Sequence, residues 1–429
     1  MNRRAPVPRA DSWRRGGCDP RRALLVDLYQ TALAAVDGRT QVMAALAQSV
    51  TAPTAVIAIG KAAPAMIAGA YAHLGAHFRS GFVTTAAGYE APLLDLPRVD
   101  LHFGDHPVPG AGSLAAGVAL RRYVAALPPA LGVLVLVSGG ASSLIEDLLP
   151  GVALQDLQAL NAWAHGRDVP IQTLNGLRRR LSTLKDGRLA ALLHGRAAEA
   201  LVLSDVPNDD PSVVGSGLIA VQTAPPLPWP SDLPSDLVTL LTRLAPPSGH
   251  RLPARVVGSL GMALDAIEGQ ARALGLQVER VTERVSGPAA EAGVAFAQAL
   301  LASTADLIIA GGETTVVLPS APGRGGRAQH LALAAAQVLD GQPNAMLLSA
   351  GTDGIDGASE DAGAVVDGGT VSRAAWDGES AAASLRQADA GRCLAASGDL
   401  IHTGPTTTNV GDLLMGLNMS DAQWARLAA

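Results

Sequence analysis

The chain has 429 residues and a formal net charge of −6 at pH 7; 48% of its residues are hydrophobic, 16% charged and 3% aromatic. This length indicates two or three domains, and the apolar content excludes a wholly disordered or fibrous protein. The acidic balance provides no basic field of the kind that binds nucleic acid or an anionic membrane, so we expect neither as a partner.

The cysteines and the apolar segments bear on the compartment. Cys18 and Cys393 are too few for a disulfide framework or a cysteine zinc site, so free thiols are expected. The most apolar stretch, 131–145, is interrupted by Ser138-Gly139-Gly140 and is too short to span a bilayer. The Arg-rich N-terminus lacks the apolar segment of a secretory signal. We predict a cytoplasmic protein; with so few aromatic residues the sequence predicts no oligomeric state.

The first half of the chain alternates strands and helices. Residues 1–20, rich in Arg, Pro and Gly, predict a flexible tail, and helical spacing of apolar residues predicts a helix over 22–50. Four short apolar runs follow, most of them leading into Gly or Ser: 54–59, 81–85, 133–137 and 200–204. With helix-compatible segments between them, they predict a Rossmann-like parallel α/β sheet with helices on both faces. Ligands bind such sheets outside the carboxyl ends of the strands.

The second half predicts another α/β domain. Residues 222–253 contain eight prolines and predict a connection between domains or a surface excursion. Strands are predicted after it at 256–257, 277–281, 306–310, 314–318 and 345–349. The strands on either side of Gly311-Gly312-Glu313 are close enough for a hairpin, which predicts a mixed sheet. We therefore predict a tail over 1–20, an N-terminal domain over 21–245 and a C-terminal domain over 246–429.

Two motifs at strand ends of the first half are suited to anions. Lys61 follows one strand and opens a helix, where it can face an anion, the alternative being a solvated surface lysine. The loop Ser138-Gly139-Gly140-Ala141-Ser142-Ser143 joins another strand to a helix, so its backbone N–H groups suit phosphate or carboxylate; alternatively it is only a tight turn. Lys61 and Lys185 are the chain's two lysines among thirty arginines. Retained lysines indicate a need for a compact charge, unless coding bias explains them.

Two further clusters lie in the first half. Arg178, Ser182 and Lys185 fall on one face of a helix predicted to end near Gly187, which is either an anion-binding face or a solvated cationic face. Three carboxylates follow the strand at 200–204, namely Asp205, Asp209 and Asp210. Carboxylates at a strand end suit Mg²⁺ or a general base, although such residues often only cap a helix.

The second half adds cations and carboxylates in glycine-rich loops. Arg324 and Arg327 lie in a glycine-rich loop at a helix start and suit phosphate oxygens. Polar loops that follow predicted strands contain Glu313 and Asp353, and a hydroxyl-rich loop near the C-terminus contains Asn409. Permanent cations, glycine-rich anion sites and carboxylates together predict phosphoryl transfer, in which cations neutralise the phosphate oxygens, Mg²⁺ bridges phosphates and a carboxylate takes the alcohol proton.

In this order, the motifs resemble those of the glycerate 2-kinase family, whose C-terminal half is the MOFRL domain and some of whose relatives are labelled hydroxypyruvate reductase. The matching segments are GKAAPAM (60–66), HPVPGAGS (106–113), SGGASSL (138–144), NGLRRRLSTLKDGRLA (175–190), LSDVPNDD (203–210), GGETTV (311–316), GRGGRAQ (323–329), AGTDGIDG (350–357) and TGPTTTNV (403–410). They are collinear from residue 60 to residue 410, and together they are far more specific than any one motif.

The resemblance implies an enzyme that phosphorylates D-glycerate to 2-phosphoglycerate with ATP and Mg²⁺, built from two α/β domains with the active site in the cleft between them. Lys61 would bind phosphate or the substrate carboxylate, Asp205 would act as base or metal-linked carboxylate, and Arg327, with Arg324 second, would stabilise the transferring phosphoryl group. The remaining expected residues are Ser138, Gly139, Gly140, Ser142, Ser143, Arg178, Lys185 and Asn409 for substrate or phosphate, and Glu313 and Asp353, beside Asp205, for metal.

The chain departs from the family pattern at several loop positions, which are Ala141, Asn208, Leu218, Ala328, His330, Thr407 and Gly411. These departures leave open which hydroxy acid and which nucleotide are used. Three alternatives to a glycerate kinase remain: a kinase for another small hydroxy acid, an NAD(P)H-dependent hydroxypyruvate reductase, and a non-catalytic sensor of glycerate or nucleotide. The absence of G-x-G-x-x-G after any predicted strand speaks against the reductase.

Overall fold

The computed structural model describes residues 19–47, 52–93, 96–165, 169, 171–222 and 228–427. The predicted tail lies outside these residues except for its last two. The chain forms two compact units. We call residues 36–259 with 407–410 the parallel-sheet unit, and the other described residues, 19–35, 260–406 and 411–427, the mixed-sheet unit. None of the described helices combines the length and apolar character needed to cross a membrane.

Six parallel strands form the sheet of the parallel-sheet unit in the order β3-β2-β1-β4-β5-β6. Their bounds are β1 Thr54–Ile59, β2 Phe78–Thr85, β3 Val99–Phe103, β4 Gly132–Val137, β5 Ala198–Ser204 and β6 Ala254–Ser259. This is the strand order of Rossmann folds, and it reverses direction between β1 and β4, the position at which such sheets bind ligands. The predicted Rossmann-like parallel sheet is therefore confirmed.

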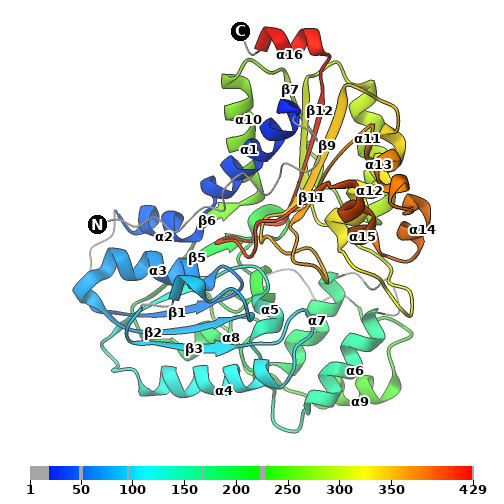
Figure 1. The fold of residues 1–429 in the computed structure, drawn as a ribbon. Helices are drawn as coiled ribbons and strands as arrows, with labels where there is room; N and C mark the ends of the chain where they lie inside the picture. The colour runs from blue at the N-terminus through cyan, green and yellow to red at the C-terminus, as the bar shows by residue number, and fades with distance from the viewer. Residues whose placement is uncertain are drawn as a thin grey trace. The chain divides into compact units, whose positions relative to one another are not determined.

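Helices cover both faces of this sheet (Figure 1). The helices of this unit are α2 Gly38–Leu46, α3 Ala63–Leu74, α4 Ala111–Ala126, α5 Ala141–Leu144, α6 Leu154–His165, α7 Ile171–Leu181, α8 Arg188–Leu192 and α9 Ser235–Arg243, of which α6, α7 and α9 pack on one another rather than on the sheet. Ile57 and Val135 on one face belong to the core that includes Leu120 of α4, while α3 packs against β1 and β2 on the other face. The central strands are buried on both faces, which explains why they are continuous apolar runs rather than alternating ones.

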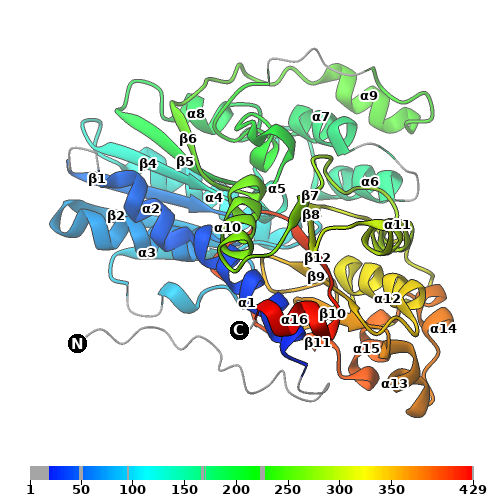
Figure 2. The ribbon, with the colours of Figure 1, turned by 90° about the horizontal axis from the view of Figure 1, so that it is seen from above.

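A second apolar cluster of this unit is built mainly from helices. It joins α6, α7 and α9 around Trp163, with Leu177 and Leu240 buried against it, and the three helices lie together in Figure 2. The proline-rich segment that we predicted as a domain connection therefore contains a packed helix. It is followed by β6, which pairs with β5. The predicted boundary at 245/246 is wrong for this reason, because residues 254–259 extend the first sheet.

The sheet of the mixed-sheet unit has the order β11-β10-β9-β12-β8-β7, in which only β7 and β8 are paired in parallel. Its strands are β7 Val278–Arg280, β8 Leu307–Gly312, β9 Ala345–Gly351, β10 Gly363–Asp367, β11 Leu400–Ile401 and β12 Asp412–Asn418. Its helices are α1 Pro20–Ala35, α10 Leu260–Ala273, α11 Ala289–Ala302, α12 Arg327–Leu339, α13 Thr370–Trp376, α14 Ala381–Arg386, α15 Ala390–Ser397 and α16 Asp421–Leu427. Helices α1 and α10 lie on one face, and α11 and α12 on the other (Figure 1).

The predicted mixed sheet is confirmed, but the predicted hairpin around Gly311-Gly312-Glu313 is wrong. Residues 314–318 form no strand beside β8; Thr315 instead makes an isolated bridge to Pro288, and the antiparallel partner of β8 is β12. The partner thus comes from about 100 residues further along the chain, which local sequence does not reveal. Proximity of two apolar runs was not sufficient to make them pair.

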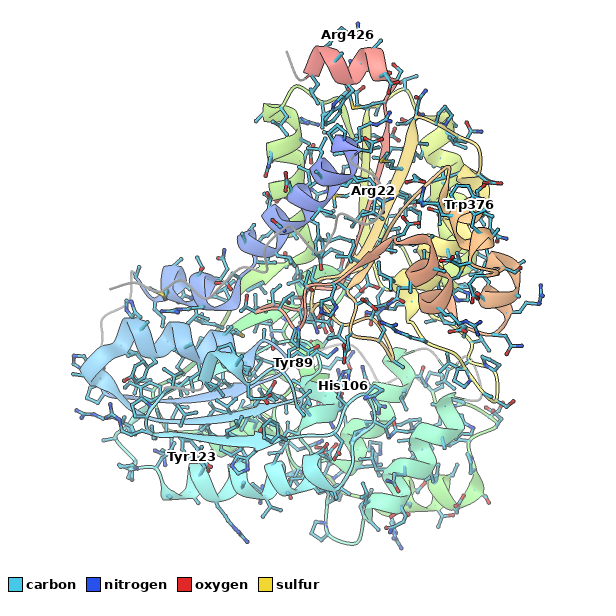
Figure 3. All side chains as sticks on the ribbon, in the orientation of Figure 1. Arg22, Tyr89, His106, Tyr123, Trp376 and Arg426 are labelled. Carbon is cyan, nitrogen blue, oxygen red and sulfur yellow. The ribbon has the colours of Figure 1, made fainter. Side chains whose placement is uncertain are left out.

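The helix predicted over 22–50 is two helices, and they belong to different units. The break falls at Asp37, whose carboxylate accepts a hydrogen bond from Thr40 N at 2.8 Å and so begins α2. In the mixed-sheet unit, Arg22 of α1 donates to Asp367 and Asp399 at 2.7 Å each, and its position is labelled in Figure 3. The N-terminal helix is therefore fixed to the C-terminal half of the chain by partly buried ion pairs.

Candidate active site

The ends of β1 and β4 are joined by the backbone where the strand order reverses. Ile59 lies opposite Val137 in the parallel register, so the two strands end side by side. Lys61 N then donates to Gly139 O at 2.9 Å, and Ala62 N to Ser138 Oγ at 3.1 Å. Gly60 has φ +129°, and a Cβ there would overlap Ser138 Oγ, so only glycine allows this approach. The arrangement places Lys61 immediately outside the reversal point.

Two aromatic residues that follow neighbouring strands lie near Lys61. Its ammonium nitrogen lies 6.0 Å from the ring centroid of Tyr89, a buried residue that follows β2. Gly140 has φ +83°, and a Cβ there would lie 3.3 Å from Lys61 Cγ and 3.4 Å from His106 Cδ2. His106 follows β3, and both aromatic residues are labelled in Figure 3. Neither Tyr89 nor His106 was predicted from the sequence. The motif HPVPGAGS begins at His106, but only the strand order places it beside Lys61.

Gly139 lies against two of the predicted polar residues. A Cβ at this position would overlap both the Asn409 amide nitrogen and the Asp205 carboxylate. Asn409 arrives in this unit on the short segment 407–410, which is held by Gly38 N donating to Thr407 O at 3.1 Å and by the Thr407 hydroxyl donating to Asp37. The structure thus brings together Lys61, Gly139, Gly140, Asp205 and Asn409.

The serines of the same loop bond within the protein. Ser138 Oγ accepts from Ala62 N, Ser142 Oγ bonds the hydroxyl of Ser216, and Ser143 Oγ donates to Gly140 O at 3.1 Å. These three hydroxyls shape the loop. Its groups best placed for an anion are therefore the glycine backbone and the neighbouring Lys61, rather than the predicted serine hydroxyls.

Arg178 and Lys185 lie in the interior, so the predicted anion-binding face is wrong. Lys185 is fully buried and forms an ion pair with Glu146, which also accepts from the Ser182 hydroxyl. Burial lowers the pKa of Lys185, while Glu146 opposes that shift. Arg178 donates to the Asn161 side chain, and burial lowers its pKa as well. The alternative of a solvated face is equally wrong, and α7 ends at Leu181 rather than near Gly187.

The neighbouring arginines hold a loop in place. Arg179 donates to Ser216 O at 3.0 Å and to Ser212 O at 3.2 Å. Arg188 donates to Ser182 O at 2.9 Å. Asp210 accepts from Ser212 N and Oγ, each at 2.8 Å, so it stabilises that loop too. The arginines of this motif therefore stabilise the backbone of the loop after β5 and of the segment after α7.

Arg327, the residue predicted to stabilise the transferring phosphoryl group, lies in the mixed-sheet unit. Its guanidinium donates to both carboxylate oxygens of Asp412, at 2.7 and 3.1 Å, and to Glu313 at 2.6 Å. Burial lowers the pKa of Arg327, but the charges of Asp412 and then Glu313 outweigh burial and hold it above the usual value. Its side chain is 36% exposed, so solvent reaches it. Asp412, which was not among the predicted site residues, lies opposite Gly312 in the sheet register.

Asp353 adds a carboxylate beside this ion pair. A Cβ at Gly351 would lie 3.1 Å from Asp353 Oδ1 and 3.5 Å from Asp412 Oδ1, so both carboxylates converge on that glycine. Tyr29 donates its hydroxyl to Gly351 O at 2.6 Å, and burial, with the two carboxylates, raises its pKa well above the usual value. Burial also raises the pKa of Asp412 against the opposing effect of Arg327.

Arg324 takes a different direction from Arg327. It donates to Asp361 at 2.7 Å, and its own backbone N–H donates to Asp389 at 2.7 Å. Half of its side chain is exposed, beside a surface pocket that Ser359 and Glu360 also line. The two arginines that appear equivalent in sequence therefore serve different surroundings.

The predicted metal carboxylates do not form a ready-made site. Asp205 belongs to the parallel-sheet unit and Glu313 and Asp353 to the mixed-sheet unit, and Glu313 is bound by Arg327. Across the described part of the chain, no group of three or more His, Cys, Asp or Glu side chains is arranged to hold a metal ion.

Comparison with known proteins identifies the family. Residues 24–226 match the model of a domain of unknown function, DUF4147, and residues 306–412 match the MOFRL family. The D-glycerate 2-kinase of Thermotoga maritima is 35% identical over 387 residues, covering 84% of this chain and 89% of that protein. The chain belongs to the MOFRL family of glycerate kinases. A protein of Agrobacterium vitis provisionally named hydroxypyruvate reductase is also 35% identical, over 83% of this chain and 97% of its own.

The solved structures agree with this family. The crystal structure of the Thermotoga maritima glycerate kinase matches 93% of this chain and all of that chain, with a TM-score of 0.77 and 30% identity. A protein of Pyrococcus horikoshii, 24% identical with a TM-score of 0.68, shares the fold.

Asn208 is one of the departures from the family pattern. Its φ of +60° lies in the left-handed region, which asparagine tolerates better than most residues. Leu218 and Ala328 are buried, so these two substitutions alter packing rather than an exposed surface.

Proposed function

We propose that the protein is an ATP-dependent D-glycerate kinase that forms 2-phosphoglycerate. The observation that carries the proposal is the meeting of Lys61, Gly139, Asp205 and Asn409 at the point where the parallel strand order reverses. Relatives named D-glycerate 2-kinase in Thermotoga maritima and glycerate 2-kinase in Pyrococcus horikoshii support the substrate.

Each residue has a role in in-line phosphoryl transfer. Asp205 accepts the proton of the glycerate hydroxyl, whose oxygen forms a bond to the γ-phosphorus as the bond to the leaving ADP oxygen breaks. Lys61 binds the substrate carboxylate or a phosphate oxygen, and Asn409 donates from its amide. Arg327 stabilises the charge on the transferring group, since its guanidinium is permanently charged and partly exposed.

The donor set fits a magnesium ion that arrives with the nucleotide. Such an ion is usually bound by one or two carboxylates together with phosphate oxygens, and does not require a cage of protein ligands. Asp205 of the parallel-sheet unit and Asp353 of the mixed-sheet unit are each a candidate carboxylate. When bound, the ion would neutralise phosphate charge.

The reductase alternative is not favoured. A Rossmann reductase binds its dinucleotide on a G-x-G-x-x-G turn after the first strand. Here β1 leads into Gly60-Lys61-Ala62-Ala63, which lacks the second glycine and presents a lysine instead. The provisional name of one relative does not alter this chemistry. The cytoplasmic location stays a prediction.

The proposal is tested by a substrate panel. Purified protein with ATP and Mg²⁺ should release ADP with D-glycerate faster than with tartronate or erythronate, and Lys61→Met protein purified identically measures any contaminating kinase. Faster turnover of tartronate or erythronate would assign a different hydroxy acid. Loss of NADH absorbance with hydroxypyruvate would contradict the kinase proposal. Thermal stabilisation by glycerate without ADP release would instead indicate a sensor.

A further inference from the structure

The first turn of α12 is capped by a residue from another loop. Arg327 is the first residue of this helix, and the preceding Gly326 has no side chain to accept its unpaired N–H groups. Asp356, which follows β9, accepts hydrogen bonds from Ala328 N at 3.0 Å and from Gln329 N at 2.8 Å. Its carboxylate is almost completely buried there. One side chain therefore satisfies two backbone donors next to the arginine.

Glycines in both loops allow this approach. A Cβ at Gly326 would overlap the Asp356 carboxylate, and one at Gly357, which has φ +60°, would lie 2.5 Å from Gly325 O. Ala358 N also donates to Gly325 O at 3.2 Å. The motifs GRGGRAQ and AGTDGIDG thus interlock through their backbones. The glycines of the two motifs allow the loops to approach each other this closely.

The Asp356 carboxylate therefore lies at the N-terminus of α12, and Arg327 is the cationic side chain of the same turn. We propose that Asp356 is a positioning residue, which fixes the first turn of α12 and thereby holds the Arg327 guanidinium between Asp412 and Glu313. Its effect on catalysis rests on the proposed kinase function. Its effect on the helix does not.

The charges around Asp356 couple this cap to pH. It faces Arg327 on α12 and Asp412 on β12. On its own loop its N–H donates to Asp361 O at 2.8 Å, and the Asp361 carboxylate pairs with Arg324. Burial raises the pKa of Asp356 from 3.8 to about 7, although the N–H groups of Gln329 and Ala328 favour the carboxylate. The carboxylate, which is the stronger acceptor, therefore forms as the pH rises through about 7.

The sign of the stability effect follows from the raised pKa. Between about pH 4 and pH 7 the unfolded chain has released this proton while the folded protein keeps it, because burial raises the folded pKa to about 7. The contribution of Asp356 to stability is thus complete below about pH 4 and is lost as the pH rises toward 7. Asp356→Asn should remove that part of the pH dependence.

Hydrogen exchange at the start of α12 tests the proposal without using activity. In Asp356→Asn, amide exchange over residues 327–331 should be about fivefold faster, the change typical of a lost helix cap. Glu360→Gln, an exposed carboxylate on the same loop, is the matched control and should leave exchange unchanged. Unaltered protein supplies the same test if the variant fails to fold. Its exchange there, corrected for the intrinsic rate, should become faster as the pH rises from about 4 toward 7, because opening the first turn of α12 lets Asp356 release its proton.

Kinetics then tests the link to Arg327. Asp356→Asn should lower kcat about tenfold with the KM for glycerate little changed, and the rise of kcat through pH 7 should disappear. Unchanged exchange in Asp356→Asn would overturn the capping role. Faster exchange with an unaltered pH profile of kcat would overturn the link to Arg327. If the unaltered protein transfers no phosphate, the proposed function fails, while the exchange result still decides the capping role.

Discussion

The two lysines of this chain contact the two ends of the same loop and have different roles. Lys61 bonds the beginning of the β4 exit loop through its backbone N–H to Gly139, and its half-buried side chain lies beside Tyr89 and Gly140. Lys185 holds the far end of that loop through a fully buried ion pair with Glu146, two residues after α5. One lysine is placed to meet a ligand, and the other fixes the scaffold behind it.

This difference shows that a cation in a sequence motif can serve either ligand binding or the scaffold. Both lysines occur where arginine is otherwise the rule, and both were expected to bind an anion. A compact ammonium suits the interior next to Glu146 as well as it suits a phosphate. Only burial and the identity of the partner separate the two roles. The same distinction separates Arg178, which is buried against Asn161, from the partly exposed Arg327.

Removing Lys185 should have the largest effect on stability. Lys185→Met leaves Glu146 buried without its countercharge, which costs about 3–5 kcal/mol in such pairs. Chemical denaturation followed by circular dichroism measures this change. The double variant Lys185→Met/Glu146→Leu should recover much of the loss, because the uncompensated charge is gone. A single variant as stable as the unaltered protein would show that the pair does not hold the loop.

Removing Lys61 should break activity and leave the fold intact. We expect Lys61→Met to lower kcat/KM by about 10²–10³-fold, the usual cost of one charge-stabilising donor, with no shift of the melting temperature. Lys61→Arg should recover little, because its planar guanidinium differs in shape from an ammonium. A destabilised Lys61→Met protein would mean that the two lysines have the same structural role.

Removing Arg324 should have the smallest effect. Its ion pair with Asp361 is half exposed, and such pairs are worth at most about 1 kcal/mol. Arg324→Gln should therefore alter kcat/KM by about fivefold or less and the free energy of unfolding by about 1 kcal/mol or less. Steady-state kinetics beside Arg327→Gln measures the difference. Equal losses in the two variants would place Arg324 in the site with Arg327.

The elements predictable from sequence were those decided locally. The runs at 54–59 and 133–137 are strands as predicted, because burial on both faces makes a strand continuously apolar. The meeting of Lys61 with the Ser138–Ser143 loop followed from their positions at parallel strand ends. These inferences needed only periodicity and the rule for ligand sites.

The errors arose where distant residues decide. Glu146 lies 39 residues from Lys185, and nothing local marks it as the partner. Asp412 joins Arg327 only because β12 inserts between β8 and β9. The Asp356 cap likewise depends on two loops that cross through their glycines. Side-chain roles in this chain are therefore set by tertiary pairing, which one sequence does not contain.

Phosphorus NMR of the protein with ATP, Mg²⁺ and D-glycerate tests the central claim most directly, because it detects transfer and identifies the phosphorylated carbon together. The account predicts a 2-phosphoglycerate signal that is lost in Lys61→Met and Arg327→Gln and kept in Arg324→Gln. A 3-phosphoglycerate signal would keep the kinase and change the hydroxyl that attacks. No transfer by folded protein that still binds ATP would contradict the account.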